Sequence, residues 1–208
     1  MALEAALSIA ALALALSLRP WRMLGGPLLT PALATLALLP WLWLLPQRLP
    51  AGLPVQFSGA SLLVLMLGWP LAVPVLALVA LQVWLIGQTG AGDVLSQGFW
   101  LGLVPATLVL AIGAVLKRYL PPNPFVYTLG RGFLGTAAAL FVSGSVMELL
   151  HHGFSGVALE QALVSRWLMA WGDAFLTGML VAVFVAFRPQ WLATWSDERY
   201  LKPPPPGA

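Results

Sequence analysis

Long apolar blocks alternate with short polar stretches along this chain, and nearly all charged residues lie between the blocks. The apolar residues run continuously within each block, which is typical of helices and not of barrel strands with their period-two alternation. Helices of about 20 residues cross a ~30 Å hydrocarbon core. The pattern therefore predicts an all-α, polytopic transmembrane bundle with six or seven hydrophobic segments. The predicted segments are about 3–18, 28–46, 57–87, 96–116, 125–150 and 162–187.

The block 57–87 determines the predicted topology. As a single helix it would be ~46 Å long at 1.5 Å per residue, which is too long for the core unless it is tilted or broken. Gly68-Trp69-Pro70 interrupts the block, so we expect two short segments hinged there, which either cross the membrane or form a broken pair. If 57–87 is counted as two passes, the N-terminus lies outside and the C-terminus inside. Only Arg48 among the loop cations then lies outside, which agrees with the positive-inside rule. The inner cations are then Arg19, Arg22, Lys117, Arg118, Arg188, Arg199 and Lys202.

The remaining segments complete the predicted organisation. We expect residues 1–201 to form one transmembrane domain and residues 202–208 to be a disordered proline-rich tail. A glycine-rich polar loop is predicted at 88–97 and a second loop at 153–161. The first block lacks the basic start of a cleavable signal and carries Glu4, so we interpret it as a transmembrane helix.

The composition agrees with a membrane protein. Hydrophobic residues make up 60% of the chain and charged residues 8%, with a mean hydropathy of +0.91. Soluble domains carry about 25% charged residues. The chain has no cysteine, so disulfides and thiolate metal sites are excluded. The net charge of +3 fits basic inner loops, and no basic stripe is long enough to indicate nucleic-acid binding.

Asp173 is the clearest polar residue at membrane depth. An intramembrane carboxylate is costly and is expected to face the bundle interior and find a partner. Arg166 lies seven positions earlier on the same helix face, and Arg131 near the start of the preceding helix is the other candidate partner. Two interpretations stay open for Asp173, a structural ion pair or bonded acid and a direct role in transport.

Glu148, His151 and His152 form the cluster with metal-ligand chemistry. Their spacing of three and four residues would place them on one face of a continuing helix. Carboxylate and imidazole ligands suit Co²⁺, Ni²⁺ and Zn²⁺. The alternative is a polar helix end that meets water on the outer side.

Several stretches resemble the permease, or substrate-specific, subunit of energy-coupling factor cobalt/nickel transporters, the CbiM/NikM family. The resemblance covers roughly 55–201 and is similar to a proteobacterial branch. The stretches are Ser58–Ala72, Leu120–Tyr127, Asp173–Leu180, Phe187–Trp195 and Asp197–Leu201. The motif residues in them are Gly59, Gly68, Pro70, Pro121, Pro122, Asn123, Gly178, Arg188, Pro189 and Tyr200.

This resemblance implies a multi-pass protein of the bacterial inner membrane that carries Co²⁺ or Ni²⁺ as substrate, with a transmembrane coupling subunit and cytoplasmic ATPases as partners. Family members begin with Met-His and carry a histidine just before the Gly-Ala stretch. This chain has Met1-Ala2-Leu3 and Gln56 at those places, and it keeps the carboxylate at Asp173. Gln56 therefore joins the cluster above as a candidate metal ligand.

Two functions remain in view. The first is a metal permease of an energy-coupling factor system, which would need a separate ATPase because the chain has no ATP-binding motif. The second is a protein on the same fold that lacks the metal site and assists another complex or carries another small solute. No nucleophile–base pair or dinucleotide fingerprint indicates an enzyme.

Overall fold

A computed structural model describes residues 1–48, 56–151 and 159–201. Its secondary structure in this part of the chain is helical, without strands, which confirms the predicted all-α bundle. The α-helices are α1 (Ala2–Ser17), α2 (Leu29–Arg48), α3 (Ala60–Leu67), α4 (Trp69–Gly87), α5 (Ala91–Gln97), α6 (Val104–Tyr119), α7 (Gly135–His151), α8 (Leu159–Phe187) and α9 (Asp197–Tyr200). Short 3₁₀ turns are η1 (Pro20–Met23), η2 (Gly26–Leu28) and η6 (Pro189–Trp191), and π-helical segments are η3 (Gly98–Leu103) and η4 (Val126–Leu134).

The helical stretches match a membrane's thickness. Within the described residues, five are long and apolar enough to cross a bilayer, and α1 is a shorter apolar helix. Two of the five are continuous through a π-helical segment, α5–η3–α6 and η4–α7. The loop predicted at 88–97 is wrong for most of its length, because α5 already begins at Ala91. The other predicted blocks correspond to helices whose ends differ by a few residues.

The chain breaks where Gly68-Trp69-Pro70 predicted a hinge. Gly68 has φ +75°, a left-handed conformation that glycine adopts without a Cβ penalty. Pro70 lies in the first turn of α4, where its missing N–H costs no helical bond. The break separates α3, which has only eight residues, from α4 with 19. The two-segment interpretation of 57–87 is thereby confirmed, and α3 by itself is too short to cross the membrane.

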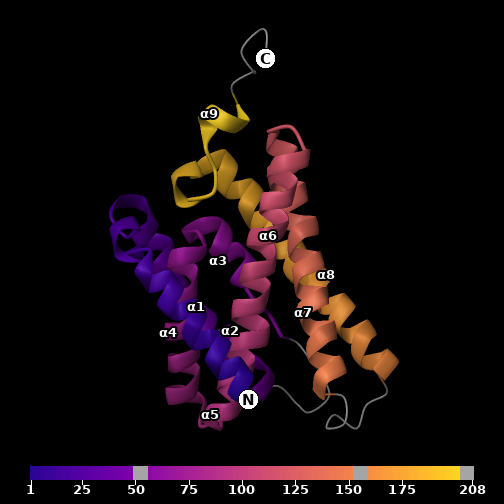
Figure 1. The fold of residues 1–208 in the computed structure, drawn as a ribbon. Coiled ribbons are helices and arrows are strands. Elements are labelled where there is room, and N and C mark those ends of the chain that lie inside the picture. The colour runs from indigo at the N-terminus through magenta and orange to yellow at the C-terminus, as the bar shows by residue number, and fades with distance from the viewer. Residues whose placement is uncertain (49–55, 152–158, 202–208) are drawn as a thin grey trace.

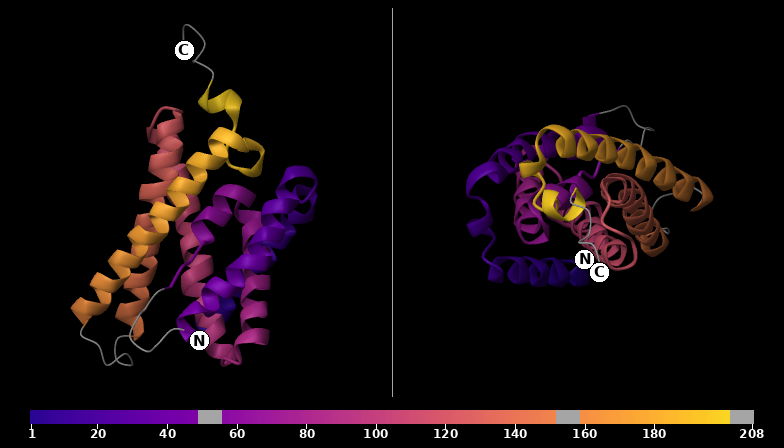
Figure 2. Two further views of the ribbon diagram at one scale, coloured as in Figure 1. Left: turned by 180° about the vertical axis from the view of Figure 1, so that it is seen from behind. Right: turned by 90° about the horizontal axis from the view of Figure 1, so that it is seen from above.

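Met1 and α9 lie at opposite ends of the bundle (Figure 1). We call the end near Met1 the N-side and the end near α9 the C-side. α3 lies in the half toward the C-side, where it packs against α4, α6 and α8. Seen from above, α1 and α8 flank the bundle on opposite sides (Figure 2).

The outer face of the bundle is apolar. Leu38, Leu85 and Phe175 are among many large hydrophobic side chains that are about two-thirds exposed. A monomeric soluble protein rarely exposes so much contiguous apolar surface, whereas lipid tails cover it without cost. The buried core is concentrated around α3 and the start of α4, with Leu63, Leu67 and Val79.

The segment after α8 folds back over the C-side end of α3. The backbone N–H of Ala193 donates to the carbonyl of Met66 at 2.8 Å, and the Thr194 hydroxyl donates to the carbonyl of Leu65 at 2.8 Å. These carbonyls belong to the last turn of α3, which has no intrahelical partners for them. Residues 192–195 therefore cap α3.

Candidate functional site

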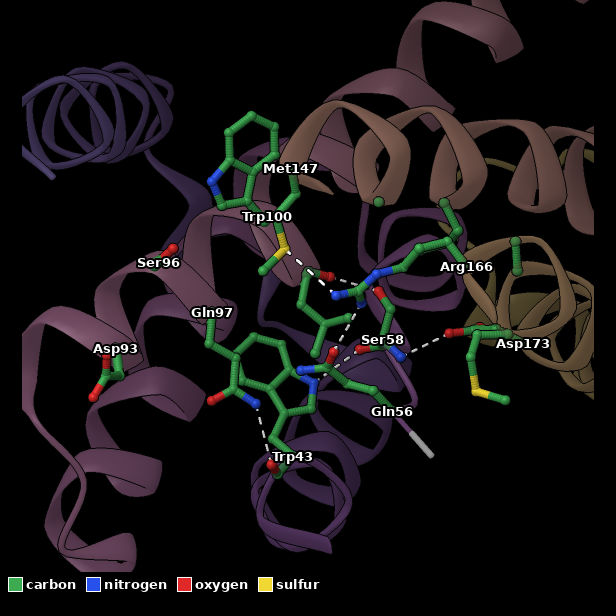
Figure 3. Close-up of a pocket in the computed structure, with 15 residues that line it drawn as sticks. Trp43, Gln56, Ser58, Asp93, Ser96, Gln97, Trp100, Met147, Arg166 and Asp173 are labelled. Atoms are coloured by element: carbon green, nitrogen blue, oxygen red, sulfur yellow. Dashed lines mark hydrogen bonds between the residues drawn. The ribbon is translucent and has the colours of Figure 1, made fainter. Parts of the chain in front are cut away.

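A polar cavity of about 360 Å³ lies in the bundle on the N-side of Asp173 (Figure 3). Its walls come from α2, the extended residues 56–58, α5 with η3, α7 and α8. The polar side chains that line it are Gln56, Ser58, Asp93, Ser96, Gln97, Arg166 and Asp173. Trp43, Trp100, Leu101, Leu140, Met147 and Met169 supply the apolar part of the wall.

Asp173 is the central residue of α8 and is only 3% exposed. Its Oδ2 accepts hydrogen bonds from the backbone N–H groups of Ser58 at 2.7 Å and Gly59 at 3.3 Å. The Thr177 hydroxyl, one turn later on α8, donates to Oδ1 at 3.2 Å. The predicted pairing of Asp173 with Arg166 or Arg131 is wrong in the described structure, because backbone amides hold this carboxylate.

The chain can present two amides to one oxygen because Gly59 has φ +66°, in the left-handed region, just before α3 begins. The first N–H groups of a helix have no intrahelical acceptors and carry a partial positive charge, so a carboxylate is stabilised there. A Cβ on Gly59 would lie 2.8 Å from Cδ1 of Leu39. Any other residue here would have a strained positive φ and would displace the Leu39 side chain.

Ser58 connects the same segment to two further walls of the cavity. Its hydroxyl donates to the carbonyl of Leu101 in η3 at 2.6 Å, and its carbonyl accepts from the indole N–H of Trp43 at 3.0 Å. The hydroxyl of Ser143 donates to the carbonyl of Trp100 at 2.6 Å. The π-helical turn η3 thus directs two carbonyls at side chains of other segments, a use of π-helices that is frequent at functional sites.

Arg166 extends from α8 toward α7 and the extended segment. Its Nε and Nη2 donate to Oε1 of Glu148 at 3.1 and 2.9 Å, and its Nη1 donates to Oε1 of Gln56 at 3.3 Å. Nη2 also lies 4.0 Å from the sulfur of Met147. The close approach depends on Gly144, where a Cβ would lie 3.0 Å from Cδ of Arg166. Two predicted metal ligands, Glu148 and Gln56, are therefore both held by one guanidinium group.

The predicted metal cluster is only partly within the described structure. His152 and the side chain of His151 lie outside the described residues, and His151 is the last residue of α7. Among the described residues there is no group of three or more histidine, cysteine, aspartate or glutamate side chains that could hold a metal ion. The metal-ligand assignment of Glu148, His151, His152 and Gln56 stays a prediction.

Arg131 is not among the residues that line this cavity. It is 8% exposed, and its guanidinium lies over the ring of Tyr127 at 5.4 Å, where the π-face attracts a cation. A Cβ on Gly113 would lie 2.6 Å from Nε of Arg131, so the Arg131 guanidinium packs directly against α6 where residue 113 has no side chain. Arg131 therefore belongs to the packing near the C-side.

The family-motif residues are mostly separate from the cavity. Gly59 borders it, Gly68 and Pro70 form the helix break, and Gly178 packs against Phe133. The others lie at the C-side, in the turn between α6 and η4 or in the segment after α8; they are Pro121, Pro122, Asn123, Arg188, Pro189 and Tyr200. In that turn the Asn123 side chain accepts the N–H of Phe125 at 2.9 Å.

Sequence reasoning missed most of the cavity wall. It assigned Asp93, Ser96 and Gln97 to a loop or a helix start, although they line the cavity from α5. Three polar residues at i, i+3 and i+4 beside an apolar block were a usable signal of one inward helix face. Trp43, Trp100 and the two methionines gave no signal, because in an apolar chain they are indistinguishable from lipid-facing residues.

A multi-pass helical bundle with a partly open cavity that polar side chains line defines a membrane protein of the transport class. A family model described as the cobalt uptake substrate-specific transmembrane region, CbiM, matches residues 1–191. The chain belongs to this family, which comprises membrane components of transporters and not enzymes. Neither the comparison with curated proteins nor the comparison with solved structures gives a match.

Proposed function

We propose that this chain is the substrate-binding permease subunit of an energy-coupling factor transporter for Co²⁺ or Ni²⁺, and that the cavity beside Asp173 receives the cargo. The observation that carries the proposal is the polar cavity itself, in a chain of the cobalt uptake family. Buried polar side chains at membrane depth are costly and are kept where a substrate passes.

The proposed orientation places the N-side outside and the C-side in the cytoplasm of a bacterial inner membrane. The helix ends that carry Arg19, Lys117 with Arg118, and Arg188 all lie toward the C-side (Figure 1). An excess of Lys and Arg is expected on the cytoplasmic side. The cavity then opens toward the outer half of the membrane, where an imported cargo arrives.

The proposed partners are a transmembrane coupling subunit and cytoplasmic ATPases. The sequence has no phosphate-binding loop, so energy for uptake comes from another chain. The C-side surface, with its basic helix ends and the folded segment 188–201, is the part of the molecule that cytoplasmic subunits can reach.

The second candidate is a member of the same fold that carries another small solute or assists another complex. One observation favours it: the oxygens of Glu148 and Gln56 accept hydrogen bonds from Arg166, a cation that competes with a metal ion for them. A guanidinium beside the candidate ligands also repels a divalent ion.

A pull-down from native membranes followed by uptake of radioactive cobalt tests the proposal. We expect an ATPase and a helical coupling subunit to co-purify, and cells that express this chain with them to accumulate ⁵⁷Co²⁺ above cells that lack it. A protein that purifies alone and supports no cobalt or nickel uptake would contradict the proposal and favour the second candidate.

The histidine pair provides a separate test of the metal assignment. His151→Ala with His152→Ala should reduce bound Co²⁺ or Ni²⁺ in the purified protein, measured by elemental analysis, if these residues coordinate the ion. Unaltered bound metal would show that the pair is a solvated helix end.

A further inference from the structure

A second, smaller cleft lies at the C-side, between the end of α6, the start of η4 and α9 (Figure 1). Its charged lining residues are both cations, Lys117 in the last turn of α6 and Arg131 in η4. The rest of its wall is apolar or aromatic and includes Leu120, Tyr127 and Tyr200. This cleft is therefore suited to a negatively charged group.

Arg131 carries a charge that the described part of the chain does not neutralise. The residue is almost fully buried, its Nε is enclosed without a hydrogen-bond acceptor, and no carboxylate of the described residues pairs with it. Its contacts are the ring of Tyr127 and the surface of α6 at Gly113. A buried ion without a counter-charge is costly, so we expect an anion from outside the chain to complete the site.

Lys117 and Arg131 lie one above the other along α6. Gly113, against which the Arg131 guanidinium packs, is four residues before Lys117 and hence on the same helix face. α6 ends at Tyr119, about 9 Å beyond Gly113. The ring of Tyr119 is 72% exposed, as is typical of aromatic residues at the level of the lipid headgroups. Arg131 is thus at the bottom of the cleft, and Lys117 is at its rim near the headgroup level.

The size of the cleft limits what it can take in. The space inside its lining is about 10 Å³, close to the room that a single water-sized group needs. One oxygen atom of an anion fits there, whereas a whole organic molecule does not. The rest of the ligand must stay outside the cleft.

We infer that this cleft binds the phosphate of an anionic phospholipid at the C-side interface of the membrane. One phosphate oxygen enters the cleft and accepts hydrogen bonds from the terminal nitrogens of Arg131, since Nε is enclosed against α6. The Lys117 ammonium, on its flexible stem, pairs with the phosphate from the rim. Basic pockets between transmembrane helices are suited to such headgroups. The inference does not depend on which cargo the protein carries.

The surroundings of the cleft favour a lipid over an acidic partner protein. Leu120 in the cleft wall and Phe125 and Leu129 near it are 44%, 77% and 57% exposed. A phospholipid supplies both complementary parts in one molecule, because its phosphate reaches the two cations while its acyl chains cover these side chains.

Native mass spectrometry of the full-length protein measures the binding. Protein in detergent is titrated with dimyristoyl phosphatidylglycerol or with dimyristoyl phosphatidylcholine, which share their acyl chains and phosphate but differ in net charge. Sodium phosphate is the soluble comparison. We expect phosphatidylglycerol to bind about tenfold or more tightly than phosphatidylcholine, because each Lys or Arg beside an anionic lipid contributes about fivefold.

Charge-removing variants assign that preference to the cleft. Arg131→Gln should reduce the affinity for phosphatidylglycerol to that for phosphatidylcholine, and Lys117→Gln should reduce it about fivefold. Arg118→Gln is the matched control, because it removes an equal charge from the same helix end, where Arg118 lies over the ring of Tyr119 and outside the cleft. It should change the affinity little.

Thermal unfolding gives a second readout and a test of folding. Without added lipid, Arg131→Gln should not lower the melting temperature, because it removes an uncompensated charge. Phosphatidylglycerol should raise the melting temperature of the wild type and of Arg118→Gln, but not that of Arg131→Gln. If Arg131→Gln does not fold, the exposed Lys117 provides the variant for the same comparison.

The alternative results overturn the inference in distinguishable ways. Equal affinity for the two lipids, or equal losses in the variants of Lys117, Arg118 and Arg131, would leave only a general effect of surface charge. Sodium phosphate that binds as tightly as phosphatidylglycerol would assign the cleft to a soluble phosphate. Loss of a co-purifying coupling subunit in Arg131→Gln, with lipid binding unchanged, would assign it to an acidic partner. Cobalt uptake is measured separately, so the proposed function stands or fails on its own.

Discussion

The two halves of this bundle are built from the same long helices, yet one is hollow and the other is solid. On the N-side, α5, α7 and α8 separate around the cavity that Arg166 and Asp173 line. On the C-side, α3 packs against α4, α6 and α8 with fully buried leucines, and Tyr127, Trp195 and Tyr200 close this half with aromatic contacts at 4.6 to 5.2 Å.

The difference depends on one short segment. Residues 56–59 are non-helical, Gln56 and Ser58 among them line the cavity, and α3 follows immediately as a packed helix. Asp173 is located at this junction, at the midpoint of α8, and binds the amides where the extended chain becomes helical. The 56–67 segment thus lies between the cavity and the packed half of the bundle.

Loss of the Asp173 carboxylate should have the largest effect. Asp173→Ala leaves the buried amides of Ser58 and Gly59 without their acceptor, at about 1–3 kcal/mol for each unsatisfied group. Asp173→Asn keeps one acceptor oxygen and should cost clearly less. Thermal unfolding in detergent measures both. If transport uses the charge itself, Asp173→Asn should abolish uptake while the protein stays folded, and wild-type stability with wild-type uptake in both variants would contradict either role.

Gly59→Ala should have the second-largest effect on stability. It places a Cβ in the left-handed region, at about 1–2 kcal/mol, and against Leu39 at 2.8 Å. The expected result is a lower melting temperature and a shifted segment 56–59. Gly172→Ala has open space at its Cβ and should leave the melting temperature unchanged or slightly raised. Equal behaviour of the two variants would show that the junction is not tightly packed.

The Arg166–Glu148 pair should contribute less than the Asp173 junction. The two side chains are 23% and 13% exposed, so water screens the charges partly. Arg166→Gln or Glu148→Gln alone should destabilise by about 1–2 kcal/mol, because one charge is left without its partner. The double variant should cost less than the sum of the two, as a double-mutant cycle of melting temperatures measures. Simple additivity would mean that the pair is not coupled.

Tyr127→Phe should have the smallest effect, on the solid half. It removes the hydrogen bond of 2.7 Å between the Tyr127 hydroxyl and Thr194, worth about 1 kcal/mol. The segment 192–195 should then open more readily and be cut faster by added protease. Tyr119→Phe changes an exposed ring that is 72% accessible and serves as the control. Unchanged cleavage would indicate that backbone hydrogen bonds alone hold the segment.

Hydropathy and glycine–proline chemistry were sufficient to predict most of the helices. The break at Gly68 and Pro70 was predictable because a positive φ and a missing N–H each favour a helix boundary there. The beginning of α5 was not, because Gly90 and Gly92 made residues 88–97 resemble a loop. Membrane packing and a long continuous helix overrode that local preference.

The partners of Asp173 could not be predicted from the sequence. A spacing of seven residues placed Arg166 on the same helix face, but seven residues rise about 10.5 Å, beyond the reach of a direct pair. Glu148 on the neighbouring helix is within reach of Arg166 and forms an ion pair with it. Asp173 instead accepts a hydrogen bond from the backbone amide of Ser58, 115 residues earlier. Every residue except proline has a backbone N–H, so the sequence does not indicate which one is the donor.

The order in which the chain is synthesised gives the 56–67 segment an unusual dependence. The hydrogen-bond acceptor of the Ser58 and Gly59 amides, Asp173, is synthesised much later than the segment itself. The donor to the Leu65 carbonyl, Thr194, lies 129 residues later in the chain. Until then these polar groups have no partner in lipid, where each costs several kcal/mol. During membrane insertion the segment must therefore remain near water or the insertion machinery, and it takes its place only after α8 and the cap have been made.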